Sequence, residues 1–179
     1  MAEHTTQRAG VIDQTPGPTI IGEDFEDRFG DWLSAALDIP RDNVRPGWKP
    51  ERLGAPEEVA VFSLGTREPD EPTISAFADG QYEVEYTGRI DIAVTLYGRN
   101  ARYLSWLLCD LFAVEQNAYE LLSRCGLGYI GAVVQAQILE SVGGQMRERA
   151  DVIISCNYAY TRTWAVRTIV EAQAKTYFD

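Results

Sequence analysis

The hydrophobic positions of the chain follow a helical period in two stretches. In the first, from Ile20 to Leu37, apolar residues recur at helical spacing, acidic residues occupy the first turns, and Pro40 stops the pattern. This arrangement predicts a helix, because the helix dipole favours carboxylates at its beginning. The second stretch begins at Asn100, whose side chain we expect to cap the helix, and it contains an expected kink near Val114.

Alternation of apolar and polar residues predicts extended strands in much of the remaining chain. The clearest segment is 82–96, where apolar residues share one parity against Glu, Thr, Arg and Asp, as is typical of a half-buried strand. Gly88 interrupts this segment and predicts a bulge, or a bend where another backbone approaches closely. Segments 130–138 and 150–160 also alternate, and the glycine pair at 143–144 predicts a hairpin between them.

The stretch before the clearest strand predicts one more strand and a loop. Segment 58–67 is apolar on both parities, which favours a central position in a sheet, and a short extended piece at 43–48 precedes it. Segment 68–80 contains Pro69 and Pro72 together with an Asp-Gly turn signal, so it predicts a connecting loop.

These segments predict an α+β fold. We expect a small mixed, mainly antiparallel sheet of about four to six strands, packed by two or three helices. Residues 1–19 are polar and rich in Pro and Gly, which indicates a flexible N-terminal arm. We expect residues 20–164 to form a single domain, and residues 165–179 to form either a last strand or an arm that reaches a neighbour.

Composition narrows the classes of function. Hydrophobic residues make up 45% of the chain and charged residues 24%, so a packed core is expected. The formal net charge of -11 argues against a protein that wraps nucleic acid, since such binding depends on Lys and Arg. No apolar run approaches the roughly 18 residues needed to cross a bilayer, and the first residues lack a secretory signal, so we expect no membrane association and synthesis in a cytosol.

Motifs for metals and cofactors are weak. The three cysteines contain no CxxC pair, and the single histidine, His4, lies in the expected arm, so neither a disulfide framework nor a metal site is predicted. Gly126, Gly128 and Gly131 form a literal G-x-G-x-x-G. In this chain the glycines close a helix and lead into a strand, which is the reverse of a dinucleotide site. We therefore interpret Gly126 as the helix stop and predict no cofactor.

No catalytic residue is predicted either. A triad that depends on histidine is excluded by the position of His4, and Cys109 and Cys156 lie among apolar positions typical of small core residues. The carboxylate pairs, such as Glu83 with Glu85, suit a solvated face as well as they suit acid and base chemistry.

Arginine and tryptophan clusters are the candidates for a subunit interface, because both residue types are over-represented at interfaces. Ordinary exposed charges with a tryptophan covering the sheet would give the same pattern. The candidate interface residues are Arg45, Trp48, Arg147, Arg149, Arg162 and Trp164.

Several short segments, read in order, resemble the bacteriophage neck or tail terminator family. They are V-R-P-G-W at 44–48, A-V-F-S-L-G at 60–65, T-L-Y-G-R-N-A at 95–101, C-G-L at 125–127 and R-E-R-A-D at 147–151. The resemblance covers roughly residues 44–164 and is carried by the order of elements and a few turn residues.

The resemblance implies a structural virion protein, assembled in the host cytoplasm, that acts without catalysis. Such a protein forms a ring, expected to be hexameric, that caps the tail tube and joins it to the head. Its implied partners are other copies of itself, the tail tube protein and the head-completion or neck proteins, while genomic DNA passes through the lumen without specific binding. We expect acidic side chains to line the bore and repel the DNA phosphates.

Three alternatives stay open at this point. The chain could be another tail or neck component, such as a head-completion protein, a tube subunit or a baseplate part. It could be a small enzyme or ligand-binding α+β domain, which would need a concave pocket with converging polar groups. A nucleic-acid-binding module is the third, and the charge disfavours it.

Overall fold

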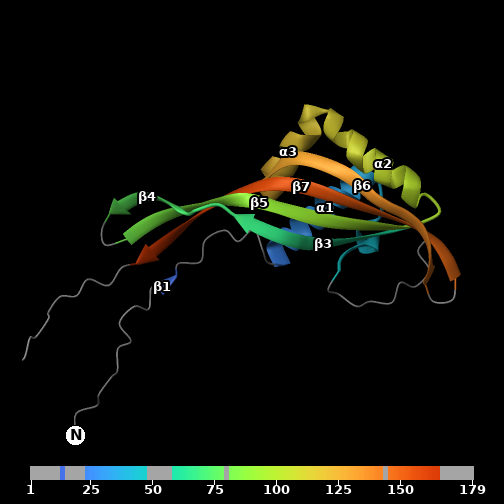
Figure 1. Ribbon diagram of the computed structural model, residues 1–179, viewed down its shortest axis with the longest axis horizontal. Helices are drawn as coiled ribbons and strands as arrows, with labels where there is room; N and C mark the ends of the chain where they lie inside the picture. Colours follow the sequence, from blue (N-terminus) through green and yellow to red (C-terminus); the bar gives the residue numbers. More distant parts are fainter. Residues whose placement is uncertain (1–12, 15–22, 48–57, 79–80, 143–144, 166–179) are drawn as a thin grey trace, which may run out of the picture.

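The computed structural model describes residues 13–14, 23–47, 58–78, 81–142 and 145–165. They form three α-helices, two short 3-10 helices and one sheet, so the fold is α+β as predicted (Figure 1). The helical elements are α1 (Glu23–Leu37), η1 (Arg41–Asn43), α2 (Ala101–Asp110), η2 (Leu111–Ala113) and α3 (Glu115–Cys125). The strands are β1 (Asp13–Gln14), β2 (Val44–Pro46), β3 (Glu58–Pro69), β4 (Thr73–Ala78), β5 (Gln81–Gly98), β6 (Leu127–Val142) and β7 (Gln145–Ala165).

The sheet is mixed and mainly antiparallel. Its main path runs β1-β7-β5-β3-β2, while β4 also pairs with β5 and β6 also pairs with β7. Only the β2–β3 pair is parallel in the described sheet. The described strands number seven, which exceeds the expected four to six. The excess comes from the short edge pieces β1, β2 and β4, whose few residues give little periodic signal.

One of these pieces corrects a sequence prediction. Residues 68–80 were expected to form a loop, but β3 continues to Pro69 and β4 occupies Thr73–Ala78. The prolines are tolerated because Pro69 is the last residue of β3 and Pro72 lies between the two strands, so neither stands in the interior of a strand. The predicted hairpin between β6 and β7 is confirmed by the pairing of Val142 with Gln145, although its two turn glycines lie outside the described residues.

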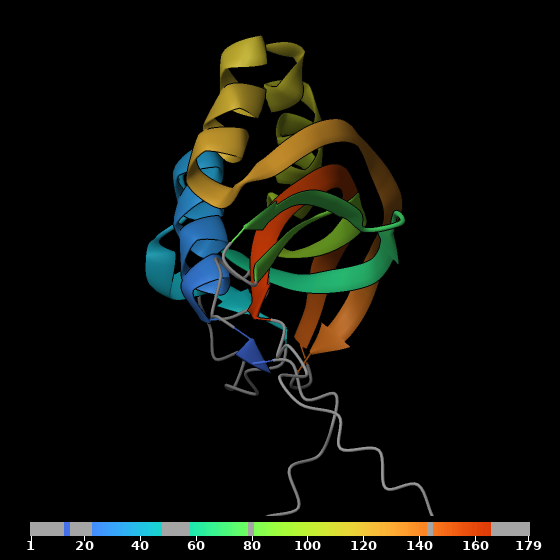
Figure 2. The ribbon, with the colours of Figure 1, turned by 90° about the vertical axis from the view of Figure 1, so that its left-hand side faces the viewer.

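The core lies between the helices and one face of β3, β5 and β7. Cross-strand pairs place Ile90 opposite Cys156, Ile92 opposite Ile154 and Val94 opposite Val152, and all six residues are buried. Because alternate residues of a strand point to opposite faces, these pairs form one continuous apolar face. Figure 2 shows α1 standing to one side of the strands, with α2 and α3 beside it at the top.

The predicted first helix is confirmed from Glu23 onward. Phe25 and Phe29 lie one turn apart, are fully buried, and stack with their ring centroids 5.9 Å apart. Phe29 in turn contacts Phe62 of β3 at a centroid distance of 5.0 Å. The helix therefore packs its aromatic stripe directly on the sheet, which is the face that the helical spacing of these residues predicted.

The second helical stretch is broken where the sequence predicted a kink. η2 separates α2 from α3, and Val114 is extended with ψ 113°. Gly126 takes the left-handed conformation with φ 71°, and its N–H donates to the Leu122 carbonyl at 2.8 Å, so the predicted helix stop is confirmed. The predicted side-chain cap is wrong, because Asn100 makes no capping bond and its amide instead donates to the Glu58 carboxylate of β3.

Gly88 divides β5 into two halves with different surroundings. A Cβ atom at this position would collide with the Glu68 carbonyl and would lie 2.5 Å from the Tyr158 hydroxyl, so the predicted close approach of another backbone is confirmed. The register of β3 on β5 also shifts nearby, between Leu64 and Arg67. On the N-terminal side of Gly88, β5 continues together with β4 and the end of β7 as a projection that the helices do not cover (Figure 1). We call residues 73–78, 81–87 and 159–165 the tongue, and the rest of the sheet the body.

The expected terminal arms fall mostly outside the described residues. Within the expected N-terminal arm, Asp13 and Gln14 form β1 and pair with the end of β7. The described part of the expected C-terminal segment is the last residue of β7, Ala165.

Candidate assembly surfaces

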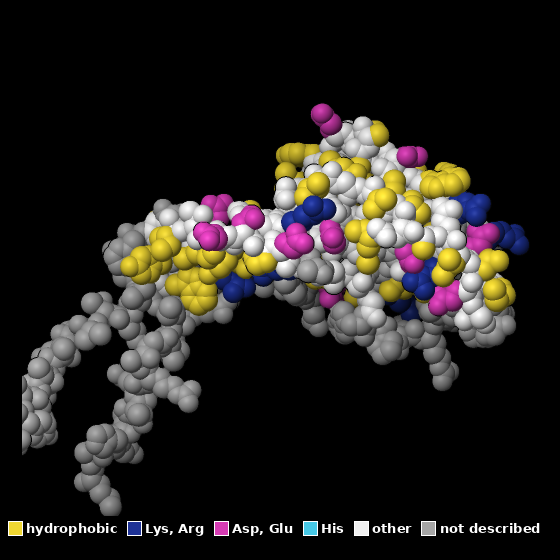
Figure 3. Space-filling view, in the orientation of Figure 1, with side chains coloured by type: hydrophobic (Ala, Val, Ile, Leu, Met, Phe, Trp, Pro, Cys, Tyr) yellow, Lys and Arg dark blue, Asp and Glu magenta, His cyan; other side chains and the backbone are white. Residues whose placement is uncertain are grey.

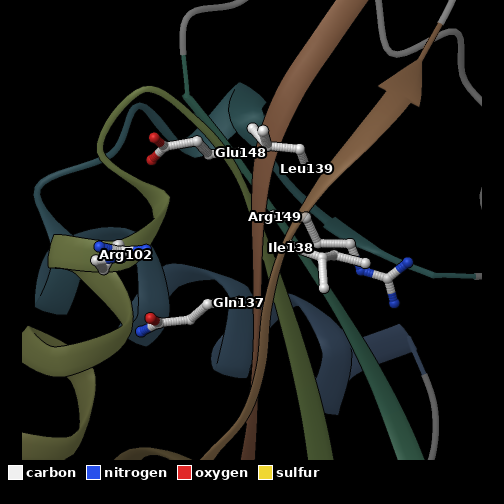
Figure 4. Close-up of a pocket in the computed structure, with 6 residues that line it drawn as sticks. All are labelled: Arg102, Gln137, Ile138, Leu139, Glu148 and Arg149. Atoms are coloured by element: carbon white, nitrogen blue, oxygen red, sulfur yellow. The ribbon is translucent and has the colours of Figure 1, made fainter.

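Charged side chains line one hollow of the described residues, beside the hairpin that β6 and β7 form. The hollow beside the β6–β7 hairpin has a volume of about 170 Å³. Figure 4 shows Arg102, Gln137 and Glu148 on one side of these strands, while Ile138 and Arg149 point to the other side. The charged groups therefore do not converge, as a catalytic or ligand site would require.

The cysteines behave as core residues. Cys125 and Cys156 are buried, and burial raises the pKa of Cys125 to about 11 and that of Cys156 to about 12. Burial also raises the pKa of Cys109. Because the thiolate is the reactive form, all three thiols stay protonated and unreactive near neutral pH, which agrees with the sequence interpretation of Cys109 and Cys156. Within the described parts of the chain, no cluster of His, Cys, Asp and Glu could hold a metal ion.

The face of the sheet opposite the core carries a network of paired charges on β5, β6 and β7. We call it the open face. Arg149 donates to the Asp151 carboxylate at 3.0 Å and to the Glu140 carboxylate at 3.1 Å, and Thr95 donates to Asp151 at 2.8 Å. Tyr97 completes the group through a hydrogen bond to Glu140, and burial followed by the Glu140 charge raises the pKa of Tyr97. The hydrogen bond with Asp151 raises the pKa of Arg149, so this arginine remains charged.

A second set of polar contacts lies further along the same face. Ser155 donates to the Asp91 carboxylate at 2.6 Å, and Arg89 donates to the Ser155 hydroxyl at 3.0 Å. The Arg89 guanidinium also lies 3.8 Å from Asp91. Figure 3 shows basic and acidic side chains next to one another across the middle of the molecule. The open face therefore carries two sets of paired charges, and an apolar row of Ala93, Ile153 and Val133 lies between them.

The tongue carries a different surface, on the same side of the sheet as the core. Three cross-strand pairs build it, in which Tyr82 lies opposite Trp164, Val84 opposite Arg162, and Tyr86 opposite Tyr160. We call these six residues the tongue surface. They are half-buried. Figure 3 shows hydrophobic side chains gathered over the projecting end of the sheet, with basic side chains beside them.

Contacts within the tongue surface hold its side chains in fixed positions. Tyr86 and Tyr160 stack with centroids 5.1 Å apart, and the Trp164 indole N–H donates to the Tyr86 hydroxyl at 3.0 Å. The Arg162 guanidinium lies over the Tyr160 ring at 5.1 Å. At the root of the tongue, Arg67 donates to the hydroxyl groups of Tyr158 at 2.6 Å and Tyr160 at 2.7 Å. An ordered aromatic and arginine surface loses little side-chain entropy when a partner binds.

The six candidate interface residues predicted from the sequence do not form one patch. Arg162 and Trp164 lie together on the tongue surface. Arg149 belongs to the open face and Arg147 lies two residues before it on β7, while Arg45 lies on the short edge strand β2 and donates to the Asp42 carbonyl at 3.0 Å. Trp48 lies outside the described residues. The interface role of all six stays a prediction.

The sequence analysis missed the tyrosines and the arginine that complete the tongue surface. Arg67, Tyr86 and Tyr160 lie on three different strands, β3, β5 and β7, so no local motif contained them. A signal was nevertheless present, since the apolar parity of both long strands changes from aliphatic residues in the body to aromatic residues toward the tongue.

The sheet also ends in strands that the described chain leaves unpaired on one side. β6 contains 16 residues and pairs only with β7, and β2 pairs only with β3. Long unpaired edges can bind another strand, and natural proteins usually cover them. The unpaired edges and the tongue surface are typical of a protein that assembles with other chains.

A comparison with known protein families identifies the family of the chain. The family model described as phage neck terminator protein matches residues 23–179, so the chain belongs to the phage neck terminator family. This family consists of structural components of the virion that associate with other head and tail proteins, as the sequence resemblance implied. A search of curated proteins finds no match to the chain. None of the described helices is long and apolar enough to cross a membrane.

Proposed function

We propose that copies of this chain close into a hexameric ring that caps the end of the tail tube and joins it to the head-completion proteins. Residues 20–164 act as the single domain of each copy. The observation that supports a ring best is that the two unpaired edges, β6 and β2, lie at opposite sides of one sheet. Such a molecule can join its neighbours in a head-to-tail manner, and a head-to-tail contact that closes gives a ring.

In this ring the open face of the sheet lines the bore. Arg149 and Arg89 are already bound to carboxylates or a hydroxyl group on this face. Paired arginines have little capacity left for DNA phosphates, because non-specific binding depends on unneutralised Lys and Arg. DNA therefore passes without being held. This amends the acidic bore expected from the net charge, since the described carboxylates of the open face alternate with arginines.

Tube elongation tests the proposal. Purified tail tube protein is allowed to polymerise, the chain is added in less than equimolar amount, and tube length and tube ends are measured by negative-stain electron microscopy. We expect shorter tubes with a ring of extra density at one end. An unrelated acidic protein of similar net charge is the control, and it should leave the length distribution unchanged.

Each other outcome identifies a different class of protein. Incorporation along the whole tube would indicate a tube subunit. Binding to heads without binding to tubes would indicate a head-completion protein. Either result would refute the capping role while leaving the membership of the family untouched.

A further inference from the structure

The tongue surface is an apolar and basic surface on a strongly acidic chain. The formal net charge is -11, yet this side of the tongue carries Arg162 between tyrosine and tryptophan side chains, with Arg67 at its root. The acidic residues Glu83 and Glu85 belong to the opposite parity of β5 and therefore lie on the other side of the tongue. A partner that fits the tongue surface must present carboxylates together with apolar side chains.

Arg162 itself has unused capacity for a partner. Its guanidinium is held over the Tyr160 ring, and its Nε is buried without a hydrogen-bond partner among the described residues. A buried donor that lacks a partner costs free energy, and a hydrogen-bond acceptor supplied by another molecule would offset that cost. A carboxylate satisfies a guanidinium best, because it accepts two parallel hydrogen bonds.

A surface that combines carboxylates with apolar side chains lies on the same chain, along α1. The exposed side of this helix carries Asp24, Asp27 and Asp31. Arg41 binds the last two carboxylates, at 3.3 Å and 2.6 Å, and no ion pair is recorded for Asp24 within the described residues. The first turns of α1 therefore present negative charge to solvent.

Beside these turns lies a hollow of about 310 Å³ between α1 and the β2–β3 edge. Glu26 lines it together with Pro46, Phe62, Ser63 and Leu64. The hollow thus combines a carboxylate with apolar side chains, which is the complement of the tongue surface. Figure 1 shows the tongue projecting from the body at one end of the sheet, away from the helices of its own chain.

We propose that the tongue surface of one copy docks on the acidic side of α1 and the adjoining β2–β3 hollow of the next copy. The donor and acceptor surfaces lie on different parts of the chain, so the contact is head-to-tail and repeats around a ring. This inference rests on the proposed ring and specifies which surfaces join its subunits.

Charge reversal tests the contact. The variants are Arg162→Glu on the tongue, Asp24→Lys on α1, and the chain that carries both. Arg99→Glu is the matched control, because it makes the same charge change at an exposed position in the turn between β5 and α2. Self-association is measured by sedimentation velocity over a range of concentrations, and circular dichroism with thermal unfolding establishes that each variant is folded.

We expect each single reversal on the contact to weaken self-association about tenfold or more, and the double variant to recover most of that loss. Arg99→Glu should assemble like the wild type. If folded Arg162→Glu assembles as well as the wild type, the tongue contact is wrong, whatever the ring does on tail tubes. If both single variants fail and the double variant recovers nothing, the pairing of the tongue with α1 is wrong.

A crosslinking experiment covers the case in which copies join only on the tube. Trp164 is replaced by a photoreactive benzoylphenylalanine, and isotopically light and heavy chains are mixed, with and without purified tail tubes. We expect crosslinks from position 164 to peptides of α1 in a different copy. Crosslinks only within one copy, or only to the tube protein, would overturn the proposal, and so would a wild-type chain that stays monomeric both free and on tubes. The tube-elongation assay reports separately on capping.

Discussion

The two long strands β5 and β7 run through both the body and the tongue, yet the two regions use the same face in opposite ways. In the body, the face presents Ile92 and Ile154, which are fully buried beneath the helices. In the tongue it presents Tyr86 and Tyr160, which are stacked and half-buried with no described helix above them. Pairing and register are unbroken between the regions, so the strands alone do not account for the difference.

The difference separates a region that the chain buries within itself from a region that stays accessible to a partner. Aliphatic side chains give their stabilisation only when they are fully removed from water. Tyrosine, tryptophan and arginine combine an apolar body with a polar group, so they tolerate partial exposure and still bind strongly when covered. The body therefore forms the core, and we propose that the tongue is a contact surface. Four changes test this comparison.

The largest expected effect comes from truncating the body core. Ile154→Ala should lower the free energy of unfolding by about 3 kcal/mol, because it removes buried methyl groups and leaves a cavity. Trp164→Ala on the tongue should cost only about 1 kcal/mol in a dilute, unassembled chain, since it removes one hydrogen bond and a half-buried ring. Urea unfolding followed by circular dichroism measures both. Equal losses would show that the tongue is part of the core.

The second effect lies at the boundary between the regions. Gly88→Ala should lower the free energy of unfolding by about 2 kcal/mol, because the added Cβ collides with the Glu68 backbone and the Tyr158 hydroxyl. Gly131→Ala is the control, since its Cβ would meet no atom within 4 Å, and its effect should stay within about 0.5 kcal/mol. The same urea titration measures the free energy of unfolding of both variants. If Gly88→Ala is as stable as the wild type, the two regions are not separated by a tight backbone contact.

The third effect contrasts a polar contact of the body with one next to the tongue. Asp151→Asn removes a carboxylate that accepts hydrogen bonds from both Arg149 and Thr95, and it should cost about 1.5 kcal/mol. Asp70→Asn removes an exposed carboxylate that accepts a hydrogen bond from Thr87, and its cost should be about 0.5 kcal/mol or less. Thermal unfolding at low salt compares the two. A larger loss for Asp70→Asn would reverse the ranking of the two regions.

The sequence predicted much of the body because its signals are local. The alternation of 82–96 and 150–160, the helical spacing of α1 and the Gly126 stop depend on neighbouring residues, and all of them are confirmed. The failures have two causes. Asn100 bonds the distant Glu58 instead of its own helix. β4 pairs with the adjacent start of β5, with Ala78 opposite Gln81, so the Asp-Gly signal at 79–80 was present but was interpreted as part of a loop. The alternation of β5 and β7 is the same on both sides of Gly88 and does not mark the end of the helical cover. The change from aliphatic to aromatic residues on the apolar parity is the only sequence signal for it that we find.

The smallest expected effect is a loss of stability at alkaline pH that originates in the body alone. Burial raises the pKa of Cys156 to about 12, compared with an ordinary value of 9.0. A group whose pKa is raised on folding stabilises the fold below its ordinary pKa, and this stabilisation is lost as pH rises through the folded value. Between about pH 7.5 and about pH 9.5, the wild type should lose about 1 kcal/mol more than Cys156→Ala.

Trp164→Ala is the control for this alkaline loss, because the tongue contains no cysteine and the variant should lose as much as the wild type. Urea unfolding at both pH values gives the two differences. If Cys156→Ala loses as much stability as the wild type between these pH values, the thiol is not held away from water. The face beneath the helices would then be as open as the tongue, and the distinction between a closed core and a contact surface would no longer hold.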